Sequence, residues 1–315
     1  MGKLVGFLFV IVLLGAAAAG GGWFWLNGAY TAAGPASEDG KPRLVVVEKG
    51  AATPAIATSL KEAGVIADAD QFRLVLRLRE FMGDKPVMKA GEYSIDSGAS
   101  MEAVVAELTT GASMQYAVII PEGLSTVQIM ELLTTKDWKA TTGTELTYKL
   151  GGEAPTDIPE GVLLPGDYAV SRGDTVADVV KRMRDAQTAL LDEIWDKRAA
   201  GIPVKTREEA IILASIVEKE TGNADEQPEV AGLYSNRLKQ SMRLQADATI
   251  VYGISKGRPL GRSITSAEIA AANNWNTYQM DGLPKTPICN PGAGAIRAAL
   301  NPAPTDAIYM MADGT

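Results

Sequence analysis

Two glutamates at the end of an apolar segment are the residues of this chain best placed to do chemistry. Residues 206–222 read Thr-Arg-Glu-Glu-Ala-Ile-Ile-Leu-Ala-Ser-Ile-Val-Glu-Lys-Glu-Thr-Gly, which predicts a nearly all-apolar helix ending in Glu218 and Glu220. Such a helix belongs in a core, where a carboxylate is costly unless it is paired or used. The chain has no histidine. If this protein is a hydrolase or a lyase, a carboxylate is therefore the expected proton-transfer group.

Helix geometry separates the two glutamates. They are two residues apart, or about 200° around a helix axis, so they cannot serve one site together. Glu220 continues the apolar row of Leu213, Ile216 and Val217, whereas the row of Glu218 has less apolar bulk. Glu220 is thus the better candidate for a desolvated carboxyl with a raised pKa. In the alternative interpretation, both glutamates only form ion pairs with bases such as Lys219, Arg237 or Arg243.

The segments that follow carry polar side chains suited to sugar binding. Residues 227–240 predict a second helix, and residues 242–253 predict extended chain whose polar residues alternate onto one face. Residues 274–278 add aromatics beside amides. The candidates for binding substrate or supporting Glu220 are Glu218, Asn236, Arg237, Gln245, Asp247, Thr249, Asn276 and Tyr278. Alternatively, they make structural hydrogen bonds within the domain.

A strand, a glycine turn and a helix recur along the chain, which predicts an α+β fold. The four copies span residues 45–60, 93–108, 118–133 and 168–183, with turn glycines at Gly50, Gly98, Gly123 and Gly173. Glycine tolerates the turn dihedrals, and a following Ser or Thr can cap the helix. Generic βα packing produces the same pattern.

The N-terminus predicts a membrane anchor. The apolar run Leu4–Leu26 has about 23 residues, enough to span a bilayer. Lys3 before it favours an N-terminus inside, which places the body in the periplasm or otherwise outside the cytoplasm. A cleaved signal peptide with its cleavage site near Ala16–Ala19 is the alternative. We expect a single-pass anchor in the inner (cytoplasmic) membrane over residues 1–27 and a tether over 28–42.

Composition excludes several classes of function. The chain has 315 residues, a formal net charge of −8, one cysteine and no histidine. The negative charge disfavours a nucleic-acid partner. Because the chain has no histidine, it cannot use a Ser-His-Asp triad or a Cys-His pair for catalysis. Nothing in the sequence calls for a metal or another cofactor.

Several sequence blocks together resemble the endolytic murein transglycosylase family (YceG-like, MltG type). They occur in the family's order and cover about residues 160–313. The blocks are Ala-Ser-Ile-Val-Glu-Lys-Glu-Thr (214–221), Ser-Asn-Arg-Leu (235–238), Met-Arg-Leu-Gln-Ala-Asp-Ala-Thr-Ile-Val-Tyr-Gly (242–253), Trp-Asn-Thr-Tyr (275–278), and Gly-Leu-Pro with Pro-Ile-Cys-Asn-Pro-Gly (282–292).

The resemblance implies a domain layout, an activity and a catalytic residue. A LysM-like region over residues 43–150 would precede a catalytic domain over 151–315. Such enzymes cut nascent peptidoglycan strands between N-acetylmuramic acid and N-acetylglucosamine and leave 1,6-anhydro ends, which terminates strand elongation. The second glutamate of Glu-Lys-Glu, Glu220, would be the catalytic acid and base. Peptidoglycan synthases or division proteins would be its protein partners.

Two departures from the family pattern limit the resemblance. The family's Glu-Gly-x-x-x-Pro-Asp/Glu-Thr-Tyr reads Glu-Gly-Val-Leu-Leu-Pro-Gly-Asp-Tyr at residues 160–168, which puts a contact of that loop in doubt. The chain ends at Thr315, whereas relatives continue with a Gly-Gly-His-containing segment, so we expect a shortened catalytic domain. Two rival functions stay open: a non-catalytic peptidoglycan-binding scaffold, and a hydrolytic muramidase that uses Glu220 with Asp247 or Glu268.

Overall fold

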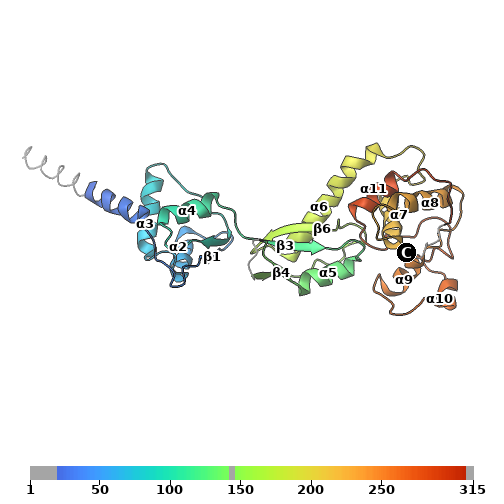
Figure 1. Ribbon diagram of the computed structural model, residues 1–315, viewed down its shortest axis with the longest axis horizontal. Coiled ribbons are helices and arrows are strands. Elements are labelled where there is room, and N and C mark those ends of the chain that lie inside the picture. The colour runs from blue at the N-terminus through green and yellow to red at the C-terminus, as the bar shows by residue number, and fades with distance from the viewer. Residues whose placement is uncertain (1–19, 142–145, 310–315) are drawn as a thin grey trace, which may run out of the picture. The chain divides into compact units, whose positions relative to one another are not determined.

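The structure is a computed structural model that describes residues 20–141 and 146–309 (Figure 1). Helices and strands both contribute, so the predicted α+β class is confirmed. The chain forms two compact units. Of the described residues, the first unit holds those up to Gln115 with 140, 141 and 171–173, and the second holds the others. This division falls earlier than the boundary predicted at residue 150, and the functional domain boundary stays a prediction.

The first unit packs helices and the strands β1 (Arg43–Val47) and β2 (Gly91–Ile95) around one apolar core. The two strands pair antiparallel, with Val45 opposite Tyr93. The helices are α2 (Thr53–Glu62), α3 (Ala69–Phe81) and α4 (Met101–Thr110). Side chains from all five elements share the core, including Val45, Leu60, Phe72, Tyr93 and Leu108. Burial of this apolar surface is the main stabilising contribution to the unit.

A helix over residues 20–31 joins this core. Its Leu26 and Tyr30 are buried there, and the Arg79 guanidinium of α3 lies 4.6 Å from the centre of the Tyr30 ring. In the part of the chain that the structure describes, no helix has the length and apolar character needed to cross a bilayer. Most of the predicted anchor, residues 1–19, lies outside the described residues, and the anchor stays a prediction.

The second unit begins with small sheets and the helices that follow them. The two-stranded sheets are β3–β6 and β4–β5, and the helices are α5 and α6. Their bounds are β3 (Gln115–Ile120), β4 (Asp137–Lys139), β5 (Thr147–Lys149), β6 (Gly166–Ser171), α5 (Thr126–Thr135) and α6 (Val176–Ile194), with a short 3₁₀ turn at Trp195–Lys197.

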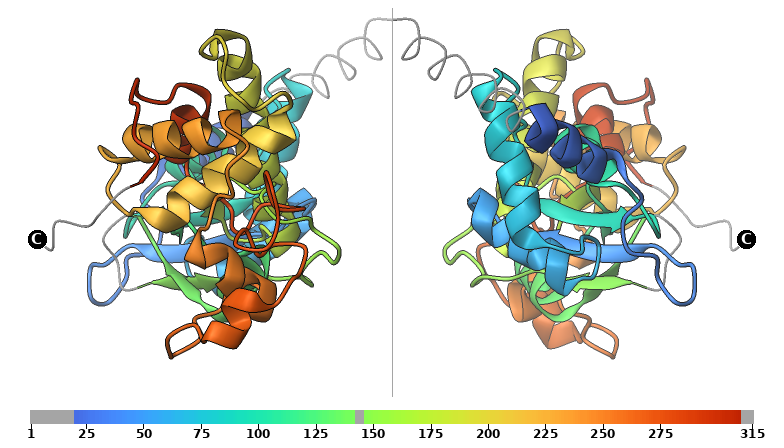
Figure 2. Two further views of the ribbon diagram at one scale, coloured as in Figure 1. Left: turned by 90° about the vertical axis from the view of Figure 1, so that its right-hand side faces the viewer. Right: turned by 90° about the vertical axis from the view of Figure 1, so that its left-hand side faces the viewer.

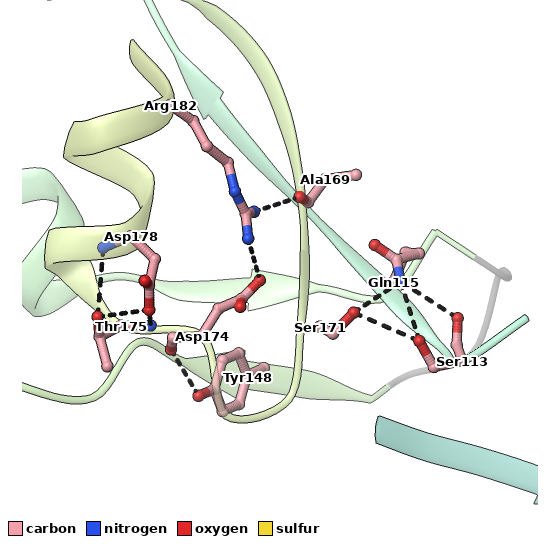
Figure 3. Close-up of polar contacts among 9 residues, drawn as sticks. All are labelled: Ser113, Gln115, Tyr148, Ala169, Ser171, Asp174, Thr175, Asp178 and Arg182. Atoms are coloured by element: carbon pink, nitrogen blue, oxygen red, sulfur yellow. Dashed lines mark hydrogen bonds and ion pairs between the residues drawn. The ribbon is translucent and has the colours of Figure 1, made fainter. Parts of the chain in front are cut away.

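Side chains fix the start of α6 (Figure 3). Thr175 and Asp178 form a capping box, in which each side chain accepts a hydrogen bond from the other residue's backbone N–H. Arg182 donates to the carbonyl of Ala169 in β6 and to the Asp174 carboxylate, both at 2.8 Å. The turn between β6 and α6 is therefore held by the side chains that follow it.

The predicted strand–turn–helix repeat is confirmed in all four copies. The turn glycines have positive φ angles of 80°, 77°, 74° and 96° at Gly50, Gly98, Gly123 and Gly173. Ser100, Ser125 and Thr175 cap α4, α5 and α6 through their hydroxyls. In the first copy Ala52 stands at the cap and makes no side-chain bond, so there the prediction of a hydroxyl cap was wrong.

Five helices build the remainder of the second unit (Figure 2, left). They are α7 (Arg207–Glu220), α8 (Gln227–Lys239), α9 (Asp247–Ser255), α10 (Ser266–Ala270) and α11 (Ala293–Leu300). Helices α7, α8 and α11 pack against one another, and residues 210–217 of α7 are buried. The predicted helices at 206–222 and 227–240 are confirmed.

The prediction of extended chain at residues 242–253 was wrong. Gln245 has a φ of +52°, which interrupts an extended segment, and α9 begins two residues later at Asp247. A carboxylate in the first turn suits the positive end of the helix dipole. The apolar run after it is too short for periodicity to distinguish strand from helix.

Gly232 in α8 should resist replacement by alanine, although alanine normally stabilises a helix by about 1 kcal/mol. An added Cβ would lie 2.6 Å from the Ala303 carbonyl oxygen and 2.7 Å from the Thr305 methyl carbon. We expect Gly232→Ala to lower the unfolding free energy by about 1–3 kcal/mol, as overpacking does. The control is Ser235→Ala in the same helix. It removes a buried hydroxyl that has no partner among the described residues, so no loss is expected. A gain in melting temperature for Gly232→Ala would contradict the close packing.

Candidate active site

Glu220 is the last residue of α7, and a tyrosine holds its carboxylate. The Tyr234 hydroxyl in α8 donates a hydrogen bond to Glu220 Oε2 at 3.0 Å. Tyr234 is only 2% exposed, so its ring is fixed between packed helices. Glu220 Oε1 has no hydrogen-bond partner among the described residues. One carboxylate oxygen is therefore anchored while the other can meet a ligand.

A second acid–phenol pair lies near the first. Asp247 is the first residue of α9, and its Oδ1 accepts a hydrogen bond from the Tyr278 hydroxyl at 2.7 Å. Arg243 donates to the Tyr278 carbonyl at 2.7 Å, and the Asn276 amide oxygen accepts from the Tyr278 N–H at 3.0 Å. These bonds fix the position of the Tyr278 side chain relative to Asp247.

Arg237 supplies a largely buried positive charge. It is 8% exposed and donates to the carbonyls of Ile308 and Leu244 at 2.7 and 2.6 Å. Its guanidinium carbon also lies 5.1 Å from the centre of the Tyr309 ring. Backbone carbonyls thus fix this charge, and no carboxylate of the described residues forms an ion pair with it.

The surroundings raise the pKa of Glu220. Burial is the largest cause, although Glu220 taken as a whole residue is exposed, and the negative charge of Asp247 acts in the same direction. The Tyr234 hydrogen bond and the Arg237 charge oppose this shift. Burial and Asp247 also raise the pKa of Tyr278 to about 12, so its hydroxyl keeps its proton. A carboxyl with a raised pKa can serve as a proton donor near neutral pH.

Glu218 faces a different set of groups. Its Oε2 accepts a hydrogen bond from the Gly292 N–H at 3.0 Å. Burial raises its pKa most, and the nearby Glu122 charge adds to this effect. The neighbouring Lys219 points its ammonium to the Gly123 carbonyl at 3.3 Å. Glu218 and Glu220 have separate partners, as the helix spacing predicts, and neither forms the ion pair that the alternative interpretation expected.

The other predicted site residues differ in burial, from fully buried to exposed. Thr249 and Asn276 are fully buried and bond within the protein, so they can support the site but not touch substrate. The Asn236 amide donates to the Thr305 and Ala307 carbonyls and holds that segment. Gln245 is exposed beside the site.

Glu268 lies in a different setting from Glu220. Two bonds from Arg262 and the cap of α10 lower its pKa to about 2, so it is no proton donor. A second carboxylate in the muramidase alternative acts in its ionised form, so Asp247 and Glu268 both stay open for that role.

Tyr234 is the functional residue that the sequence prediction did not select. It follows Val230 by four residues and so lies on the inward stripe of its helix. A hydroxyl on that stripe needs a buried partner. This signal was available in the sequence. The acid that the Tyr234 hydroxyl meets, however, depends on how α7 packs against α8.

Comparisons with known proteins agree with the resemblance seen in the sequence. The model of the YceG-like family matches residues 45–315. A Bacillus subtilis (strain 168) protein named endolytic murein transglycosylase is 27% identical over 88% of this chain and 81% of its own length. A protein of the same name from Streptococcus pneumoniae serotype 2 (strain D39) is 26% identical over 99% of this chain, which spans 61% of that protein. A solved yceG-like protein of Listeria monocytogenes has a TM-score of 0.48 and 22% identity, over 87% of this chain and 94% of its own.

Proposed function

The chain belongs to the YceG-like family, and on this premise we propose that it is an endolytic murein transglycosylase with Glu220 as its catalytic residue. The relatives' name supports the activity. The observation that carries the residue assignment is the Glu220 carboxyl itself. It has a raised pKa, is anchored by Tyr234 and lies within the fields of Asp247 and Arg237.

The proposed reaction uses one carboxyl in two steps. Protonated Glu220 donates its proton to the glycosidic oxygen, and the bond from that oxygen to the anomeric carbon of N-acetylmuramic acid breaks. The C6 hydroxyl of the same sugar then attacks the anomeric carbon and gives its proton back to Glu220. The products are a 1,6-anhydro end and a free 4-hydroxyl on N-acetylglucosamine, with no water consumed. No second carboxylate nucleophile is needed, unlike in most glycosidases.

The neighbours of Glu220 have complementary roles in this proposal. Tyr234 orients the carboxyl. The Asp247 charge favours the protonated form of Glu220 before the first step and stabilises positive charge that develops on the sugar. Tyr278 fixes Asp247 by its hydrogen bond.

End-group analysis of digested glycan tests the reaction. Purified strands are incubated with the protein, and the products are analysed by mass spectrometry. We expect 1,6-anhydro ends. Reducing ends would instead support the muramidase that uses Glu220 with Asp247 or Glu268. Strands that stay intact but bind would support the scaffold alternative.

Tyr234→Phe should shift the pH profile of cleavage. The Tyr234 hydroxyl stabilises the ionised form of Glu220 and so lowers its pKa. Without this hydroxyl the pKa of Glu220 rises further, so its acid form persists to higher pH. A lost hydrogen bond of about 1.4 kcal/mol should shift the basic limb of the profile of kcat against pH by about one unit to higher pH. The control is Tyr252→Phe, which removes a phenol that donates to Glu160 instead. Equal shifts in both variants would contradict the assignment.

The proposal includes a location and partners. An N-terminal anchor over residues 1–27 would hold the enzyme in the inner membrane with the catalytic unit outside the cytoplasm. There it would meet nascent glycan, together with peptidoglycan synthases or division proteins. The repeat in residues 43–150 would bind glycan as a LysM-like region.

A further inference from the structure

A pocket of about 600 Å³ lies beside the opposite end of α7 from Glu220. Its walls include Glu160, Tyr252, Trp275 and Ile211. Ile211 and Glu220 are nine residues apart on the helix, or about 14 Å at the usual rise. The volume is in the range of small-ligand sites. We call it the Glu160 pocket, and it is separate from the catalytic carboxyl.

Glu160 carries a negative charge that only neutral donors satisfy. The Thr126 N–H and hydroxyl and the Asn290 amide donate to its Oε1 at 2.8, 3.0 and 2.9 Å. The Tyr252 hydroxyl donates to Oε2 at 3.0 Å. Within residues 20–141 and 146–309 no cation forms an ion pair with Glu160, and burial raises its pKa. A desolvated carboxylate of this kind favours a positive charge beside it.

The nearest aromatic faces and a second acceptor extend this preference. Tyr252 and Trp275 meet edge to face, with ring centres 5.6 Å apart. Lys256, which is not among the residues that line the pocket, lies over the Trp275 ring at 3.4 Å from its centre. Gln187, 5% exposed, also lines the pocket. Its amide nitrogen bonds to Gly161, and its Oε1 has no partner among the described residues. The floor of the pocket thus has more acceptors than donors.

The rim carries charges of both signs, because the exposed Glu208 lies there beside two arginines. Arg184 and Arg207 stand at the mouth, and Arg207 pairs with Asp192 at 2.5 Å. The Arg184 guanidinium has no hydrogen bond or ion pair in the described part of the chain. Between rim and floor the walls are apolar, with Leu191, Ile211 and Pro287 among them. An occupant would therefore carry a carboxylate outside, an alkyl chain in the middle and a hydrogen-bond donor inside.

We propose that the Glu160 pocket binds a peptide whose diamino acid places a free side-chain ammonium beside Glu160, while a free carboxylate of the same peptide lies at Arg184. The inference rests on the proposed function, because stem peptides of peptidoglycan carry both groups. A cross-link acylates this amine and removes its charge. The pocket therefore distinguishes strands with free stem peptides from cross-linked ones.

Calorimetric titration of the full chain tests this assignment without any glycan. The probes are L-alanyl-γ-D-glutamyl-L-lysine, the same tripeptide acetylated on its side-chain amine, and free lysine. We expect the tripeptide to bind at least about tenfold more tightly than its acetylated form, the factor that corresponds to 1.4 kcal/mol. Equal affinities of these two, no binding, or equal affinity for free lysine would overturn the proposal.

Variants locate the binding. Glu160→Gln should weaken the tripeptide at least about tenfold, whereas Glu208→Gln, an equal change at an exposed carboxylate on the same rim, should not. If circular dichroism shows that Glu160→Gln does not fold, tripeptide binding is measured with Thr188→Trp instead. This variant fills the mouth of the Glu160 pocket from the exposed side of α6. Tripeptide binding unchanged in Thr188→Trp would overturn the site. A protein that binds the tripeptide but cleaves no glycan would contradict the proposed function alone.

Discussion

Replacing Glu220 by glutamine is expected to abolish formation of 1,6-anhydro ends, with a fall in kcat of at least about 10³. General acid and general base catalysis each contribute about 10²–10⁴, and one carboxyl performs both steps in the proposed reaction. Glutamine keeps the shape and can still accept the Tyr234 hydrogen bond. The loss should therefore appear in turnover and not in the melting temperature. Released products are quantified by mass spectrometry at matched protein concentration.

The control for this variant is two residues away on the same helix. Glu218→Gln keeps an oxygen that can accept from the Gly292 N–H, so activity should stay within about tenfold of the wild type. If both variants are equally inactive, the helix face on which a glutamate lies does not identify the catalytic residue. If Glu220→Gln retains activity, another group is the acid.

The position of Glu220 was predictable because it depends on local periodicity. A helix with apolar residues on every side must be buried, and spacing then decides which terminal charge continues the bulkier row. The structure gives Glu220 and Glu218 different partners, as the spacing predicts, but Glu220 is the more exposed of the two residues, so its expected greater burial is not confirmed. The four glycine turns were predictable for a similar reason, since a positive φ is a local demand that glycine meets at least cost.

The surroundings of the site were harder to predict. Whether residues 247–255 form a helix or a strand depends on tertiary packing, because a short apolar run fits both. Thr249 and Asn276 looked like a sugar-binding wall but are buried, with their polar atoms bonded to nearby chain. Glu160 opens the Glu-Gly block at residues 160–168, but nothing in the local sequence shows which groups it meets. Its partners Thr126 and Asn290 are 34 and 130 residues away.

Asn290→Ala is expected to be the most destabilising single change near the site. Asn290 is fully buried, and its amide nitrogen donates to the Leu124 carbonyl, the Thr126 hydroxyl and Glu160. Its amide oxygen accepts from the Leu163 N–H at 3.0 Å. Alanine leaves these groups unsatisfied. Each buried unpaired group costs about 1–3 kcal/mol, so we expect a loss of about 3–5 kcal/mol in unfolding free energy after partial rehydration.

Urea unfolding followed by tryptophan fluorescence measures this loss, since Trp195 and Trp275 report on the second unit. The control is Asn274→Ala, an equal change at an exposed residue whose side chain makes no hydrogen bond in the described part of the chain. Its effect should stay within about 0.5 kcal/mol. An equally small effect of Asn290→Ala would mean that water replaces the amide at little cost. Asn290 would then not be what holds Glu160 and the backbone leading to Gly292 in place. A large loss would instead show that the Asn290 side chain links the Glu160 pocket to the backbone segment that binds Glu218.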